Sequence, residues 1–156
     1  MANIDNKCKD LDVRDYFTEN GYNHSKNSLE DLYSLQNKTQ SMYFEKQGKK
    51  PFSEYNIGDV VDFLMVTNHA IIDELHEMMD AVGGIEDGEG NAAWKPWKST
   101  KSDLTPGDLK ELKMEWIDVM HFVFNAGLAI GVTPKEFYNF YLSKNEENWN
   151  RQKNNY

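Results

Sequence analysis

Acidic side chains recur at a spacing of three residues in two stretches of this sequence that also carry many apolar residues. In IIDELHEMM, Glu74 is followed three residues later by Glu77, and in MEWIDVMHF, Glu115 is followed by Asp118. Residues three apart lie about 60° from each other around an α-helix, so each pair occupies one side of its helix. If the two stretches face each other, the four carboxylates form an oxygen-rich site suited to Mg²⁺ or Mn²⁺.

Two other interpretations of these acidic residues stay open at this point. Acidic pairs are common on solvated helix faces, so either pair could belong to the surface. The segments Asp73-x-x-His76 and Asp118-x-x-His121 also have the carboxylate–histidine spacing of di-iron helical bundles. Those bundles use Glu in this motif, and the other helices here offer no partner Glu in an apolar face. We therefore expect His76 on the surface and His121 packed beside a carboxylate or a carbonyl.

Two side-chain amides could contact a ligand. Gln36 and Gln40 lie four residues apart in the sequence. An amide offers both a hydrogen-bond donor and an acceptor, which is what recognition of a pyrimidine edge requires. Exposed glutamines on helices are more common than base-reading ones, so the spacing alone leaves both interpretations open.

Basic and aromatic side chains gather in two further places. The segment WKPWK contains Trp94, Lys95, Trp97 and Lys98. Its rings could stack on a base and its lysines could bind phosphate, or the tryptophans could close the end of a helical bundle. Near the C-terminus, Lys144, Asn148 and Arg151 fall on one helical face. They could bind phosphate oxygens, or simply form the solvated end of a helix whose dipole favours cations.

The composition limits the class of protein. The 156 residues are of the size of one domain, and 17 basic against 26 acidic residues give a formal charge of −9. This charge argues against a nucleic-acid binder and against an anionic-membrane binder. The single cysteine, Cys8, excludes a disulfide framework within one chain. We find no apolar run long enough to cross a bilayer and no signal peptide, so we expect a cytoplasmic protein.

Hydrophobic spacing and capping signals predict four main helices and no strand. The first begins with Ser28 as N-cap, buries Leu32, Leu35, Met42 and Tyr43 on one face, and ends at Gly48 and Pro51. The second begins near Asn56 and Asp59 and stops at Gly83-Gly84. The motifs TPGD and TPKE predict helices over 106–130 and 134–150. Residues 85–105 form a loop too long for a simple connector.

The fold class predicted is therefore all-α, a bundle of four main helices. We expect residues 1–27 to form a loosely ordered arm and residues 28–156 to form the domain. The segments Gln-xxx-Gln, ELHE, VGG followed by WKPWK, EWIDVMHF and SKNEENWNRQKNNY occur in this order along the chain.

Taken together, these segments resemble the all-α dimeric dUTPase family, most closely its dCTP/dUTP pyrophosphatases from T-even bacteriophages, and more distantly the MazG-like NTP pyrophosphatases. The resemblance implies a homodimer that hydrolyses deoxypyrimidine nucleoside triphosphates to the monophosphate and pyrophosphate with Mg²⁺. It implies a MazG-like enzyme with another base preference as the first alternative. A helical binding protein without catalytic activity is the second.

The resemblance also implies roles for individual residues. Glu74, Glu77, Glu115 and Asp118 match the metal ligands, with Glu74 and then Glu77 as the general base. The residues implied to contact substrate are Gln36, Gln40 and Asn125 for the base and sugar, Trp94, Lys95, Trp97 and Lys98 over the nucleotide, and Lys144, Asn148, Arg151 and Tyr156 at the triphosphate.

Overall fold

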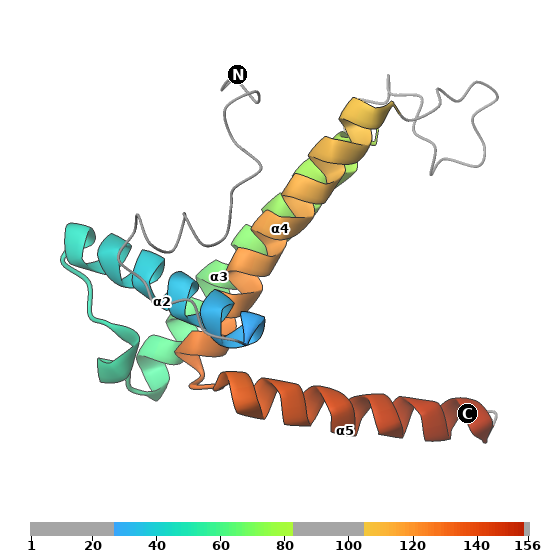
Figure 1. Cartoon of the computed structure of the whole chain (residues 1–156). Coiled ribbons are helices and arrows are strands. Elements are labelled where there is room, and N and C mark those ends of the chain that lie inside the picture. Colours follow the sequence, from blue (N-terminus) through green and yellow to red (C-terminus); the bar gives the residue numbers. More distant parts are fainter. Residues whose placement is uncertain (1–26, 83–104, 155–156) are drawn as a thin grey trace.

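The computed structural model describes residues 27–82 and 105–154, and within these ranges the chain is helical without a strand (Figure 1). The helices are α2 (Ser28–Gln47), the short 3₁₀ helix η2 (Phe52–Glu54), α3 (Ile57–Asp80), α4 (Pro106–Ala129) and α5 (Pro134–Lys153). The predicted all-α class with four main helices is confirmed. The predicted arm over residues 1–27 lies, apart from Asn27, outside the described residues.

Reciprocal capping fixes where three of the helices begin. At α3, the Asn56 side chain accepts hydrogen bonds from the backbone N–H groups of Gly58 and Asp59, and the Asp59 carboxylate accepts from the Asn56 N–H at 2.9 Å. At α4 and α5, the threonines of the TPGD and TPKE motifs, Thr105 and Thr133, form the same reciprocal pair of hydrogen bonds, called a capping box, with the acidic residue three positions later. Such boxes satisfy N–H groups that a helix start leaves free, so these starts could be predicted from local sequence.

The predicted cap of α2 is wrong by one residue. Asn27, rather than Ser28, is the N-cap, and its side chain accepts a hydrogen bond from the Leu29 N–H at 3.1 Å. Asn and Ser are about equally good caps, so two adjacent candidates could not be separated by propensity. The predicted end is confirmed, because α2 stops at Gly48, which adopts a left-handed φ of 63°.

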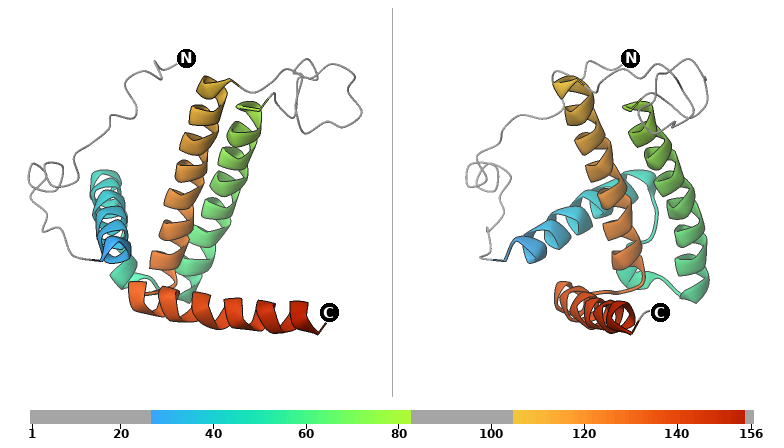
Figure 2. Two further views of the ribbon diagram at one scale, coloured as in Figure 1. Left: turned by 45° about the vertical axis from the view of Figure 1, so that its right-hand side comes forward. Right: turned by 90° about the vertical axis from the view of Figure 1, so that its right-hand side faces the viewer.

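Helices α3 and α4 lie side by side and run in opposite directions (Figures 1 and 2). This antiparallel pair is the longest contact between helices in the described part of the chain. The second half of α3 therefore lies beside the first half of α4. The segment with Glu74 and Glu77 consequently meets the segment with Glu115 and Asp118, as the functional hypothesis requires.

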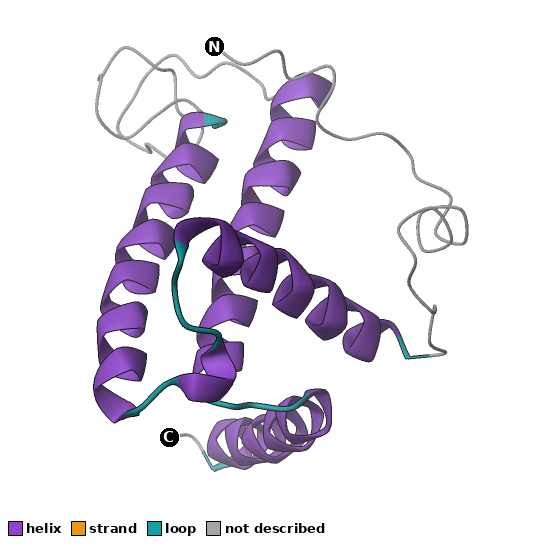
Figure 3. Cartoon of the chain, turned by 90° about the vertical axis from the view of Figure 1, so that its left-hand side faces the viewer, coloured by secondary structure: helices purple, strands orange, loops and turns teal. Residues whose placement is uncertain are grey.

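Helix α2 lies across the α3–α4 pair (Figure 3), and aromatic side chains hold it there. Near the start of α2, the Tyr33 ring packs edge-on against Phe124 of α4 at 5.1 Å between centroids. Near its end, the Phe44 ring packs against Phe52 at 5.0 Å and against Phe63 of α3 at 6.0 Å. Edge-to-face contacts of this kind add to the burial of the rings. Helix α2 is thus fixed at both ends, one against α4 and the other against α3.

The predicted buried face of α2 is wrong. Tyr33, Gln36 and Phe44 are buried, whereas Leu32 and Met42 are 49% and 61% exposed. Tyr43 is also exposed, and Leu35 is half-buried. The large rings and one amide face the neighbouring helices, because those side chains have partners there: Phe124, Phe63 and Asn125. Leu32 and Met42 of α2 are left largely exposed to solvent.

Few apolar side chains are buried in the described ranges. The buried ones are Tyr33, Phe44, Val119, Phe124 and Ala129, and none of them is less than 2% exposed. On α4 and the residue that caps its end, exposed apolar side chains recur every seven residues and form a stripe: Leu109, Trp116, Val123 and Ile130. Further large apolar side chains are exposed on α3 and α5. Within residues 27–82 and 105–154, many large apolar side chains are therefore exposed rather than packed.

None of the described helices is by itself long and apolar enough to cross a membrane. Helices α4 and α5, which are bent by 106° at their junction, pass that test only when they are joined.

The aromatic contacts of α2 give the first prediction. Replacing Phe44 by Ala removes a side chain that is 3% exposed and that packs against the rings of Phe52, Tyr55 and Phe63 beyond its own helix. We expect the free energy of unfolding to fall by about 3–5 kcal/mol, as for other buried Phe residues. Urea unfolding followed by circular dichroism measures it. The exposed residue Lys46, two residues further along α2, provides the control Lys46→Ala, for which a loss below about 0.5 kcal/mol is expected. Equal losses for both variants would contradict this packing.

Candidate functional site

Three carboxylates meet where α3 and α4 lie side by side. One oxygen from each of Glu74, Glu77 and Glu115 lies within 4.8 Å of the others. Glu74 and Glu115 are half-buried and Glu77 is exposed. Three anionic oxygens at this separation repel one another, and they match the ligand set of a hard divalent cation. The cluster contains three of the four predicted metal ligands.

The electrostatics of Glu74 reflect this crowding. Burial raises the pKa of the Glu74 carboxyl, and the neighbouring charges of Glu77, Asp118, Glu115 and Asp73 raise this pKa further. Asp118, the fourth predicted ligand, is not in the close cluster but contributes to the field at Glu74. A bound cation would reverse that field, so the residues present fit a metal ion.

A hollow of about 400 Å³ adjoins the carboxylate cluster and is lined mainly by acidic residues. Its walls include Glu77 and Asp80 from α3 and Glu111 and Glu115 from α4. Glu111 is a residue that the sequence analysis did not single out. Its spacing of four from Glu115 places the two on one side of a helix, and this spacing was the available signal.

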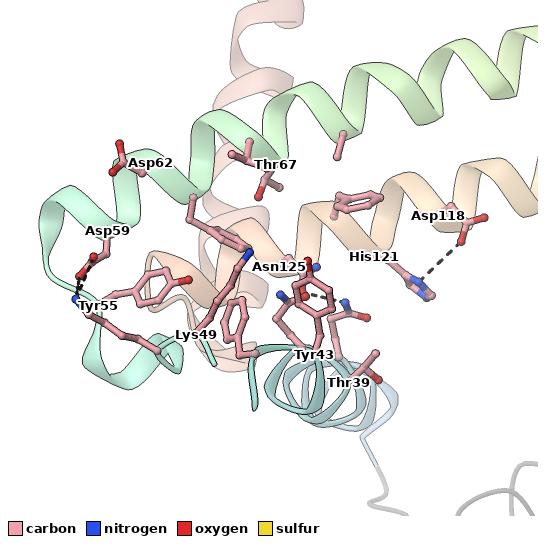
Figure 4. A pocket seen from close by; sticks show the side chains of 18 of the residues that line it. Thr39, Tyr43, Lys49, Tyr55, Asp59, Asp62, Thr67, Asp118, His121 and Asn125 are labelled. Atoms are coloured by element: carbon pink, nitrogen blue, oxygen red, sulfur yellow. Dashed lines mark hydrogen bonds and ion pairs between the residues drawn. The ribbon is translucent and has the colours of Figure 1, made fainter. Parts of the chain in front are cut away.

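A pocket of about 930 Å³ lies between α2, α3 and α4 (Figure 4). Glu74 and Asp118 lie in its wall, and so do the predicted base-contacting residues Gln36, Gln40 and Asn125. The volume is in the range of small-molecule sites. The structure thus brings two of the predicted metal ligands and all three predicted amides to one cavity, although they come from three helices.

Two of these amides are bonded to each other. The Gln36 Nε2 group donates a hydrogen bond to Asn125 Oδ1 at 2.9 Å, drawn as the dashed line beside Asn125 in Figure 4. The two residues are only 9% and 5% exposed. A polar pair this deeply buried is tolerated because each side chain satisfies the other. This contact joins residues 89 positions apart, so the sequence could not reveal it.

Other pocket residues were not predicted. Lys49 and Lys50 follow the end of α2, where Lys50 Nζ pairs with Asp59 at 3.0 Å and Lys49 lies over the Tyr43 ring at 5.3 Å. Aromatic rings, including Tyr55, line the same region. Cations after a helix-ending glycine are common in loops, so nothing in their spacing marked them as part of a site.

The histidines do not support the di-iron alternative. Among the described residues, the one group of acidic and histidine ligands close enough to share an ion contains no histidine. His76 is exposed, as expected. His121 lines the pocket with its Nδ1 3.9 Å from Asp118 Oδ1, yet its side chain is 56% exposed rather than packed.

The predicted triphosphate-binding residues of the C-terminal helix are not brought to the pocket in the single chain. Lys144, Asn148 and Arg151 are exposed on α5, which extends from the lower end of the α3–α4 pair (Figure 2). The Glu147 carboxylate accepts a hydrogen bond from Lys144 Nζ at 2.8 Å and another from Arg151. These neighbours hold the pKa of Glu147 below its usual range.

Five predicted substrate contacts lie outside the described residues. They are Trp94, Lys95, Trp97 and Lys98 of the WKPWK segment and the terminal Tyr156. Their assignments stay predictions.

Comparison with known proteins identifies similar sequences. The chain is 36% identical to a dCTP pyrophosphatase of Enterobacteria phage LZ5, with 69% of each chain covered, and 33% identical to a dCTP pyrophosphatase of Enterobacteria phage T4, with 64% covered. The match thus spans about two thirds of these relatives. A DNA replication protein of phage T4 is 31% identical over 57% of this chain and 25% of its own length. No protein-family model and no solved structure matches.

The carboxylate cluster predicts a link between metal binding and stability. The raised pKa of Glu74 means that the metal-free fold binds this proton more tightly than the unfolded chain does, so the protonated carboxyl stabilises the fold at low pH and that effect is lost as pH rises through the folded pKa. In EDTA near neutral pH, Glu74→Gln should therefore melt at a higher temperature than the unmodified protein.

Added Mg²⁺ should raise the melting temperature of the unmodified protein more than that of Glu74→Gln, because a cation stabilises the state that binds it. Calorimetry at several Mg²⁺ concentrations measures both shifts. A variant that melts lower than the unmodified protein in EDTA would argue against mutual repulsion in the cluster.

Proposed function

The chain belongs to the family of the phage dCTP pyrophosphatases, and on this premise we propose that it hydrolyses dCTP and dUTP to the monophosphate and pyrophosphate with Mg²⁺. The observation that carries the proposal is the meeting of three carboxylates, Glu74, Glu77 and Glu115, on the paired helices. The adjoining pocket contains the buried amides Gln36 and Asn125. A nucleoside triphosphate needs a cation site for its phosphates and a pocket with hydrogen-bonding groups for its base. The carboxylate cluster and the amide-lined pocket offer these two parts.

The proposed metal ligands are Glu74, Glu77, Glu115 and Asp118. A nucleoside triphosphate is strongly anionic, and this acidic surface would repel it without a counter-charge. Divalent cations held here would neutralise the phosphates and polarise the α-phosphoryl group. Mn²⁺ also prefers oxygen ligands and is expected to substitute for Mg²⁺.

Glu74 is the proposed general base, and Glu77 is the next candidate. In the reaction, the oxygen of a water molecule bonds to the α-phosphorus, the bond from that phosphorus to the bridging oxygen breaks, and pyrophosphate leaves. Glu74 takes the proton that the water loses. The raised pKa of Glu74 favours this role, because a base acts best when its pKa approaches the working pH.

The remaining contacts of the substrate are proposed from the resemblance. Gln36, Gln40 and Asn125 recognise the base and sugar, and Trp94, Lys95, Trp97 and Lys98 cover the nucleotide. Lys144, Asn148, Arg151 and Tyr156 bind the triphosphate once the C-terminal segment is brought over a pocket. In that state, phosphate oxygens take the place that Glu147 has beside Lys144 and Arg151 in the single chain.

A homodimer is part of this proposal. Two observations support the homodimer: the apolar stripe of α4, which repeats every seven residues, and the scarcity of buried apolar residues. Two copies of the α3–α4 pair could bury these surfaces in a four-helix bundle. We further propose that the enzyme acts in the cytoplasm of the infected host, since the relatives are encoded by phages of enterobacteria.

The catalytic assignment predicts the effect of two neutral substitutions. Glu74→Gln and Asp118→Asn should each lower kcat by roughly 100-fold or more, because each removes a charge needed to hold the cation or accept a proton. Circular dichroism should stay helical. EDTA should stop the unmodified enzyme, and Mg²⁺ or Mn²⁺ should restore it.

The matched control is Glu45→Gln, an exposed carboxylate on α2 outside the pocket, which should keep full activity. A panel of nucleoside triphosphates assayed for pyrophosphate release completes the test. Turnover of dCTP and dUTP alone supports the proposal. Turnover of purine or modified nucleotides instead would indicate a MazG-like enzyme, and no turnover would indicate a binding protein.

The dimer predicts a further variant. Trp116 is 52% exposed and stands in the apolar stripe of α4, so Trp116→Glu should place a charge in the buried interface. Light scattering should then give a mass near 18 kDa at concentrations where the unmodified protein is twice that size. The exposed residue Lys135 gives the control Lys135→Glu. An unmodified protein that is itself monomeric would refute the dimer.

A further inference from the structure

Two buried amides in the wall of the pocket are hydrogen-bonded to each other. Gln36 of α2 and Asn125 of α4 are both buried, and they share a single hydrogen bond of 2.9 Å from Gln36 Nε2 to Asn125 Oδ1. Both also line the pocket that contains Glu74 and Asp118. A ligand that fills this pocket therefore meets an amide pair that is already bonded.

The atoms left over by that bond are the ones that a ligand would contact. They are Gln36 Oε1, an acceptor, and Asn125 Nδ2, a donor. Within the described ranges, every side-chain nitrogen or oxygen that is inaccessible to solvent has a hydrogen-bond partner. These two atoms consequently keep some accessible surface, and the residues that carry them both line the pocket.

The bond couples the orientations of the two amides. If Gln36 alone rotated by 180°, two oxygens would face each other, and if Asn125 alone rotated, two nitrogens would face each other. Either arrangement loses the bond inside a buried site, which is unfavourable. If both rotate, the bond is kept with its direction reversed. The pocket then meets a donor on Gln36 and an acceptor on Asn125, so it always meets one of each.

Cytosine and uracil differ by the same reversal. At positions 4 and 3, cytosine presents an amino donor and a ring-nitrogen acceptor, whereas uracil presents a carbonyl acceptor and an N–H donor. One orientation of the amide pair is complementary to cytosine and the other to uracil, whichever amide faces position 4. Fixed donors and acceptors could match only one of these bases.

We propose that Gln36 and Asn125 form a coupled amide switch that rotates as a unit and so lets one pocket read either cytosine or uracil. The inference rests on the proposed function, because it places the base of dCTP or dUTP at this pair. It adds a physical reason why the pocket would accept both bases while rejecting pyrimidines with another hydrogen-bond pattern.

The direction of the bond can be measured directly. The full-length protein, labelled with ¹⁵N and ¹³C, is saturated with dCMP or with dUMP, the proposed products, which carry the same bases. Scalar coupling across the hydrogen bond identifies which amide nitrogen donates. We expect the donor to be Gln36 in one complex and Asn125 in the other.

The outcomes separate the two proposals. The same donor in both complexes, with both triphosphates hydrolysed, would overturn the switch and leave the proposed function intact. If neither nucleotide perturbs the two amides and neither triphosphate is hydrolysed, the proposed function fails together with the switch.

Substrate analogues give a second test that needs no variant. The 4-O-methyl analogue of dUTP presents two acceptors, which a coupled pair cannot match. N4-methyl-dCTP carries a methyl group at the same position but keeps one donor and one acceptor, and is the matched control. We expect kcat/KM for the 4-O-methyl nucleotide to be lower by at least about tenfold. Comparable values for the two nucleotides would mean that the amides do not rotate as a unit, and would overturn the switch.

Discussion

The packing of α3 against α4 is the constraint on which the rest of the structure depends. Two helices that run in opposite directions bring Glu74 and Glu77 against Glu115, with one oxygen of each within 4.8 Å of the others. This arrangement is unfavourable for the folded chain by itself, as the raised pKa of Glu74 indicates. Proteins keep such like-charge clusters where function uses them, because a bound cation turns the repulsion into attraction. The cluster also stands on long helices, which hold ligands more precisely than loops do.

Helix α2 forms a third wall beside this acidic surface, so that a pocket lies between α2, α3 and α4. Its two aromatic anchors, Tyr33 against Phe124 and Phe44 against Phe63, fix it across the α3–α4 pair. Between the anchors, Gln36 reaches Asn125. Because the same helix supplies the structural rings and the pocket amide, the position of the amide relative to the carboxylates is set by core packing. The base-recognition and metal-binding parts of the proposed site are therefore linked through the α2 contacts.

Two surface features of the described residues bear on the proposed assembly and the proposed activity. The apolar stripe of α4, which includes Trp116 and Val123, has no cover in the described part of the chain. Helix α5 extends from the body with Lys144 and Arg151 paired to Glu147 rather than directed to the pocket. The proposed homodimer would cover the stripe, and the proposed anionic substrate would give the two cations another partner. The proposed assembly and the proposed activity thus account for different parts of the same exposed surface.

The sequence by itself determined the features that depend on neighbours along the chain. Asn56 with Asp59 and Thr105 with Asp108 close around single helical turns, so the helix starts were readable, and the spacings of Glu74 with Glu77 and of Glu115 with Asp118 placed each pair on one helix side. Only the tertiary structure decided which face of α2 is buried, that Gln36 meets Asn125, and that Lys144 does not reach the pocket in one chain. The reason is physical. Capping and helical spacing are fixed by bonds within a few residues, whereas the burial of a side chain depends on what another helix, far along the chain, places opposite it.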